Sequence, residues 1–264
     1  PEWFNALRTR FTEWRVYTSP ALVNRDYHWG QNAEEMTRGL TTETLPALHL
    51  AVSIRSFRAE QLSDFVSAVI AAEPQTACDL YQRIKDRYPI VMTRDLATAK
   101  RWLRSKARGT ERYGLVASSG ASRLKPEGVN IHEEIDAPTW FLNDKTDVRS
   151  SYYLETPATQ FDVQGLELDW VCVCWDGDLR FQNERWSYYD FRGTAWQNVK
   201  DATRAAYLLN TYRVLMTRAR QGMVIFIPRG DVKDPTRNPD FYDGTAEFLE
   251  MCGIRLVTDS CVPS

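Results

Sequence analysis

Two polar segments interrupt apolar sequence in the second half of this chain, and their side chains are of the kinds that bind phosphate and ribose. The segment TQFDVQGLE, residues 159–167, brings hydroxyl, amide and carboxylate groups and one glycine to the entrance of the apolar run 170–175. The segment YRVLMTRAR, residues 212–220, places Arg218 at the end of an apolar helical pattern. A guanidinium can neutralise phosphate charge, and a glycine lets the backbone approach a ligand closely. These segments are therefore candidate walls of a ligand cleft.

The elements that must position these segments alternate between strands and helices. Apolar, β-rich runs predict strands near 45–55, 90–92, 114–117, 168–175, 222–228 and 254–258. Helical patterns lie near 56–73, 96–107, 201–220 and 245–252. Strands separated by helices of ten or more residues favour an α/β fold, with a mainly parallel sheet covered by helices on both faces. In such folds the loops at the carboxyl ends of the strands carry the site.

Those loops are rich in hydroxyls and arginines, which suit phosphate and ribose better than an apolar ligand. Because a nucleic-acid backbone consists of phosphate and sugar, six side chains of these loops are candidates for contact with one: Thr93, Arg94, Ser118, Ser119, Arg123 and Thr159. The simpler alternative is that the serines only form a hydroxyl-rich turn.

Composition limits the classes of protein that the chain can represent. It has 264 residues, of which 43% are hydrophobic, and a net charge of -2, as expected for a globular domain. No apolar run is long enough for a membrane span, and the first residues have no apolar signal core, so we expect no membrane partner and a cytoplasmic location. The five cysteines are scattered without a CxxC pair, which predicts no metal site.

The charge is concentrated in one segment. Residues 83–125 contain twelve Lys or Arg against three Asp or Glu. A basic segment in a nearly neutral chain could follow a phosphate backbone, or it could be a solvated helix face. The sequence leaves both interpretations open.

Three segments in order resemble motifs of superfamily 1 helicases. LHLAVSIRSFRAEQLSDFVSAVI, residues 48–70, resembles motif IV, residues 159–167 resemble motif V, and residues 212–220 resemble motif VI. With ASSGASRLKPEG and VCVCWDGDL, the chain is similar to an uncharacterised bacterial helicase-like family related to the Schlafen group 3 DNA/RNA helicase domain. The resemblance implies a RecA-like fold of the P-loop NTPase type.

The resemblance also implies residue roles. Arg55 and Arg218 match the arginines that reach the γ-phosphate of ATP, Gln164, Gly165 and Glu167 match the nucleotide-binding part of motif V, and Thr159 matches a threonine near the nucleic-acid backbone. For Arg218, the alternative is that it satisfies carbonyls at the end of its helix.

The domain organisation follows from which motifs are found. None of the thirteen glycines precedes a lysine and there is no Asp-Glu dipeptide, so a phosphate loop and a magnesium-binding pair are not recognised. We therefore expect residues 45–264 to be the second RecA-like domain of an ATP-dependent DNA or RNA helicase or translocase, and residues 1–44 to connect it to a first RecA-like domain. ATP and Mg²⁺ would then bind with that first domain, single-stranded DNA or RNA would be the substrate, and this chain alone would be inactive.

Two other classes of function are also considered. One is a metal-dependent nuclease in which Glu167, Asp169, Asp176 and Asp178 gather magnesium. The other is a helicase-derived module that binds nucleic acid without hydrolysing a nucleotide.

Overall fold

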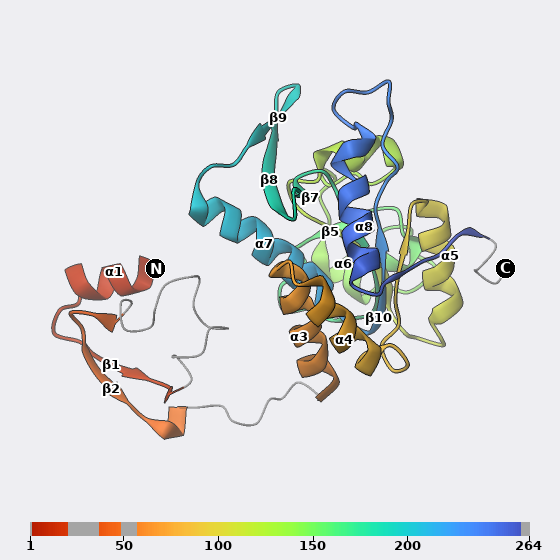
Figure 1. Ribbon diagram of the computed structural model, residues 1–264. Coiled ribbons are helices and arrows are strands. Elements are labelled where there is room, and N and C mark those ends of the chain that lie inside the picture. The colour runs from red at the N-terminus through yellow and green to blue at the C-terminus, as the bar shows by residue number, and fades with distance from the viewer. Residues whose placement is uncertain (1, 21–36, 49–56, 260–264) are drawn as a thin grey trace. The chain divides into compact units, whose positions relative to one another are not determined.

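The structure is a computed structural model that describes residues 2–20, 37–48 and 57–259 (Figure 1). The chain divides into two compact units, Pro1–Ser56 and Phe57–Ser264. The division falls after residue 56, whereas the sequence places the start of the main domain at residue 45.

The first unit is small. It contains α1 (Glu2–Thr9) and two short parallel strands, β1 (Arg15–Thr18) and β2 (Thr41–Thr44). The prediction of a strand from about Leu45 is wrong for its first residues, because Pro46–Leu48 form a 3-10 turn, η3. Proline suits a first helical turn, since its φ is fixed and it has no N–H to leave unpaired. The rest of that predicted strand, with Arg55, lies outside the described residues.

The second unit is built on a six-stranded sheet in which every strand pair is parallel. The strand order is β11-β3-β10-β6-β4-β5. The strands are β3 (Ile90–Thr93), β4 (Tyr113–Ala117), β5 (Ala158–Thr159), β6 (Leu168–Cys174), β10 (Ala219–Phe226) and β11 (Arg255–Leu256). This sheet and its helices confirm the predicted α/β class and are consistent with a RecA-like fold.

Helices cover both faces of the sheet. They are α3 (Phe57–Ile70), α4 (Pro74–Ile84), α5 (Leu96–Lys106), α6 (Ala137–Leu142), α7 (Ala202–Met216) and α8 (Asp243–Met251), with 3-10 turns η4 (Ser122–Glu127), η5 (Ser151–Tyr153) and η6 (Pro239–Phe241). Alternate residues of β6 enter two separate cores: Val171 and Val173 pack with α3, α4, α7 and α8, while Cys172 and Cys174 pack with α5. Because successive side chains of a strand point to opposite faces, this division shows that both faces are buried.

The helical stripe predicted in residues 56–73 is confirmed. Leu62, Phe65, Val66, Val69 and Ile70 are all buried in α3. Pro74, which the pattern makes a helix terminator, also occupies the first turn of α4.

A three-stranded antiparallel sheet between β6 and α7 has no counterpart in the sequence prediction. It consists of β7 (Leu179–Gln182), β8 (Arg185–Arg192) and β9 (Ala195–Asn198), and Figure 1 shows β8 and β9 extending away from the parallel sheet. The buried guanidinium of Arg180 anchors it, with Cζ 3.6 Å from the ring centre of Phe241 and 4.0 Å from that of Tyr189. Burial lowers the pKa of Arg180 to about 10.

No helix among the residues described combines the length and the apolar character that crossing a membrane requires.

Candidate nucleotide and nucleic-acid faces

The motif V segment (residues 159–167) and the end of α7 meet at the edge of the sheet where β6 and β10 begin. The amide N–H of Leu168 donates to the carbonyl oxygen of Arg218, with 3.1 Å between N and O. The Arg218 side chain donates from Nη1 to the carbonyl oxygens of Val163 and Leu166, each at 3.4 Å. The two segments that the sequence identifies separately are therefore hydrogen-bonded to each other. We call the region formed by residues 163–168 and Arg218 the amino edge of the sheet.

Arg218 also binds its own helix. Its Nε donates to the carbonyl oxygen of Val214 at 3.0 Å, in the last turn of α7. A cation in this position satisfies helix-end carbonyls and interacts favourably with the helix dipole. The side chain thus has the structural role that the sequence analysis gives as its alternative, and the same contacts hold its guanidinium against the motif V segment.

Three of the predicted nucleotide-binding residues in the motif V segment are open to solvent. Gln164, Gly165 and Glu167 are exposed. Gly165 has φ +83°, and no atom lies within 4 Å of the position where a Cβ would stand. The glycine therefore serves the turn, because a positive φ is costly for other residues, and it leaves the backbone accessible.

At the opposite, carboxyl edge of the sheet, the predicted nucleic-acid contacts divide into buried and exposed groups. Thr93 and Ser118 are each 1% exposed. Their hydroxyls accept hydrogen bonds from the N–H groups of Asp95 and Gly120, so they close the turns after β3 and β4. The half-buried Thr159 donates from Oγ1 to Oδ2 of Asp162 at 2.6 Å.

Gln160 is a residue of this edge that the sequence analysis does not single out. Its Nε2 donates to Oγ of Ser119 at 2.8 Å, and its Oε1 accepts from the Ser119 N–H at 2.9 Å. The pair joins the loops that follow β4 and β5, and Ser119 is exposed. The signal available in the sequence is its place directly after Thr159 in the motif V segment.

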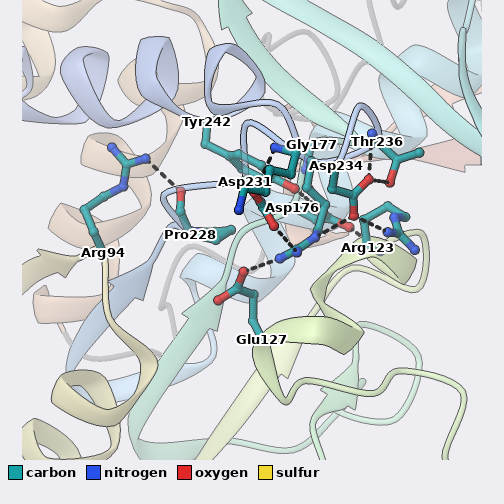
Figure 2. A network of polar contacts seen from close by, with 12 residues as sticks. Arg94, Arg123, Glu127, Asp176, Gly177, Pro228, Asp231, Asp234, Thr236 and Tyr242 are labelled. Atoms are coloured by element: carbon teal, nitrogen blue, oxygen red, sulfur yellow. Dashed lines mark hydrogen bonds and ion pairs between the residues drawn. The ribbon is translucent and has the colours of Figure 1, made fainter.

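The two predicted phosphate-binding arginines of this edge are held by ion pairs. Arg94 donates to the carbonyl oxygen of Pro228 at 2.7 Å and pairs with Asp243 at 2.6 Å. Arg123 pairs with Asp234 at 2.9 Å, and its guanidinium lies over the ring of Phe191. Figure 2 shows the contact of Arg94 with Pro228 and, separately, that of Arg123 with Asp234 in the loops of this edge.

The comparison with protein families agrees with this architecture. A family model described as the Schlafen group 3 DNA/RNA helicase domain matches residues 9–229. The chain belongs to this family. The matched residues include the motif V segment and Arg218, so the amino edge lies inside the helicase domain. Neither the curated proteins nor the solved structures gave a match.

Behind the carboxyl edge, the helicase domain buries two carboxyl groups. Asp176 is 0% and Asp178 is 1% exposed. Asp176 accepts from the N–H groups of Gly177 and Arg123 and from the hydroxyl of Tyr242. Asp178 accepts from the hydroxyl of Tyr212. Burial, reinforced by the charge of Asp178, raises the pKa of Asp176 to about 7, and burial raises the pKa of Asp178 to about 6.

The nuclease alternative does not fit this geometry. Glu167 and Asp169 lie at the start of β6, while Asp176 and Asp178 follow its end. A strand of seven residues, about 20 Å long, separates the two pairs. Asp169 accepts instead from the N–H of Arg112 and from Arg220. Among the described residues, no three His, Cys, Asp or Glu side chains are grouped to hold a metal ion.

The basic segment 83–125 does not form a uniform cationic surface in the helicase domain. Four of its cations pair with acids that are remote in the sequence: Arg94 with Asp243, Lys100 with Glu155, Arg101 with Asp259, and Arg123 with Asp234. These pairs neutralise part of the charge for which the sequence leaves open a phosphate-binding face or a solvated helix face.

Proposed function

We propose that this chain is the second RecA-like domain of an ATP-dependent DNA or RNA helicase or translocase. The nucleotide binds at the amino edge, between this domain and a first RecA-like domain of the same protein that carries the phosphate loop and holds Mg²⁺. The observation that carries the proposal is the direct contact between Arg218 and the backbone of the motif V segment. This contact places a guanidinium beside the exposed Gln164 and Glu167, where nucleotide phosphates and ribose would be bound together.

The proposed chemistry is phosphoryl transfer to water. During this reaction negative charge accumulates on the γ-phosphoryl oxygens and on the leaving oxygen, and fixed cations stabilise it. Arg218 would supply such a cation once the nucleotide competes with the carbonyl oxygens of Val163 and Leu166 for its guanidinium. Arg55 is proposed as the second cation on the basis of motif IV. Glu167 would accept a hydrogen bond from the ribose, and Gln164 would respond to the nucleotide state.

Single-stranded DNA or RNA is proposed to bind at the carboxyl edge. Two groups are best placed to contact its backbone: the exposed Ser119, which is hydrogen-bonded to Gln160, and the half-buried Thr159. Thr93 and Ser118 are less accessible because they are buried. Arg94 and Arg123 would contribute mainly by holding the loops in place through their ion pairs.

The decisive experiment is the ATPase rate of the intact protein with and without a single-stranded oligonucleotide. An arginine finger contributes about 10³-fold or more to the rate, so R218A and R218K should reduce stimulated turnover by about that factor while ATP binding persists. The matched control is R220A, because Arg220 is an exposed arginine of the same edge that pairs with Asp169 at 3.1 Å. Its turnover should stay near that of the unmodified protein.

Because Arg218 also satisfies helix-end carbonyls, each variant needs a thermal melt. R218K keeps a cation at the helix end, so a folded R218K protein with lost turnover supports the finger role. A folded R218A or R218K protein with full turnover would contradict the motor proposal and favour a module that binds nucleic acid without hydrolysis.

A further inference from the structure

A groove on the β11 side of the sheet has a composition unlike its surroundings. It encloses a volume of about 580 Å³ along the strands β3 and β11. One wall comes from the end of α4, with Tyr81 and Lys85, and the other from the end of α5, with Trp102 and Lys106. Helices α4 and α5 pack into different cores, so the groove wraps over the sheet edge from one face to the other.

The groove has three cations and no acidic side chain in its lining. Lys85, Lys106 and Arg255 are exposed cations that line it, and no Asp or Glu does. Within the described part of the chain, no carboxylate lies within ion-pair distance of any of these three cations. This contrasts with Arg94, Lys100, Arg101 and Arg123, each of which is ion-paired.

The alternative explanation for the lysines is the helix dipole. Lys85 is the C-cap of α4 and Lys106 is the last residue of α5, where cations are favoured. That explanation accounts for about half a charge at each helix end and does not apply to Arg255, which is on a strand. Three cations that converge from two helices and one strand leave a net positive charge in a concave site.

We infer that this groove binds the phosphate backbone of a nucleic-acid strand, as a contact separate from the carboxyl edge. Trp102 is 5% and Tyr81 is 7% exposed, so their rings offer little area for stacking on a base. Two exposed polar side chains also line the groove. Gln82 accepts from Nζ of Lys85 at 2.6 Å, which leaves its amide N–H groups to donate to phosphate. Ser105 donates to the Trp102 carbonyl at 2.8 Å, which leaves its oxygen to accept. The groove would therefore position a strand without reading its sequence.

This inference rests on the proposed nucleic-acid function but not on Arg218 or on ATP hydrolysis. It is tested by binding of a fluorescein-labelled 20-nucleotide oligo(dT) to the full chain across a series of salt concentrations. Each phosphate contact to a single strand contributes about 0.7 to the slope of log K against log salt. The triple variant K85A/K106A/R255A should bind at least tenfold more weakly at low salt, and its slope should be shallower by about 2.

The matched control is R83A/R87A/R108A, which removes three exposed cations of the basic segment that do not line the groove. It should bind within about twofold of the unmodified chain, because local contacts and not net charge hold the strand. An uncharged methylphosphonate strand should bind the unmodified chain and the groove variant equally. Thermal melts should agree, since all six side chains are exposed.

Equal losses in both triple variants, or no loss in the groove variant, would overturn the inference. Direct binding of inorganic polyphosphate distinguishes the two sources of phosphate, and tighter binding of polyphosphate than of the oligonucleotide at equal phosphate concentration would also overturn the inference. The motor proposal is judged separately. If R218K abolishes turnover while the groove variant keeps full affinity, the groove inference fails alone, and the reverse pair of results removes only the motor.

Discussion

The hydroxyl of Tyr212, in α7, donates a hydrogen bond to Oδ1 of Asp178, which follows β6 at the carboxyl edge. The same hydroxyl oxygen accepts from the N–H of Asp176 at 3.2 Å. Helix α7 ends at Met216, and Arg218 follows two residues later at the amino edge. One buried phenol therefore ties the loop at one edge of the sheet to the helix that carries the candidate arginine at the other.

Removal of that hydroxyl should destabilise the fold. In Y212F the ring keeps its contact with Trp175, with the ring centres 4.1 Å apart, but the Asp178 oxygen and the Asp176 N–H lose a buried partner. The free energy of unfolding should fall by about 1 to 3 kcal/mol in urea titrations. The control Y207F alters a tyrosine of the same helix that is 52% exposed, and it should change stability by less than about 0.5 kcal/mol. Equal stabilities for the two variants would show that the buried hydrogen bonds contribute nothing.

Stability should decrease as the pH rises towards neutrality. Burial raises the pKa of Asp176 to about 7 and that of Asp178 to about 6, from an ordinary value of 3.8. The folded chain thus holds these protons more tightly than the unfolded chain. Their stabilising effect is complete below about pH 4 and is lost as the pH passes through about 6 to 7.

The measurement is the free energy of unfolding at several pH values from about 4.5 to about 7.5. D178N should reduce the decrease with pH, because one of the two buried groups no longer titrates. D79N, which changes an exposed aspartate of α4, should keep the slope of the unmodified chain. A D178N slope as steep as that of the unmodified chain would mean that Asp178 does not carry the effect.

Two glycines should respond differently to the same substitution. In G222A the new Cβ would stand 2.6 Å from the carbonyl oxygen of Pro89 and 2.7 Å from the ring of Trp170. Overpacking of this kind costs about 1 to 3 kcal/mol or more. In G165A the space is open and the cost is the positive φ alone, about 1 kcal/mol. Thermal unfolding should therefore show the larger loss for G222A, and the reverse order would contradict the packing described here.

Loss of the Gln160 amide should weaken strand binding at the carboxyl edge without unfolding the domain. Q160A breaks both hydrogen bonds to Ser119, which join the loops after β4 and β5. We expect a fall in affinity for single-stranded oligonucleotides of roughly three- to tenfold, equivalent to about 1 kcal/mol for lost preorganisation. Q197A, at an exposed position of β9, is the control. Unchanged oligonucleotide affinity in Q160A would remove Ser119 and Gln160 from the proposed strand-binding site.

The periodicity of the sequence was sufficient to predict the class of fold. Apolar strands alternating with amphipathic helices can bury both faces of a sheet only in an α/β arrangement, and β6 and β10 have the two-sided burial that this requires. The antiparallel strands at 179–198 were missed. They lie in a single insertion between two well-patterned elements. Their packing depends on the rings of Tyr189, Trp196 and Phe241 around Arg180, and no local sequence pattern predicts these contacts.

The sequence by itself determined the residue types, their order and the turn chemistry: a glycine at 165, an arginine at the end of α7, hydroxyls after β4 and β5. Tertiary structure alone decided which of these groups a ligand can reach. Thr93 and Ser118 are buried while Ser119 is exposed, because each loop folds over its own strand end. Arg94 and Arg123 are neutralised by acids 149 and 111 residues away. Electrostatic interaction depends on distance in space, and only the folded chain brings such remote charges together.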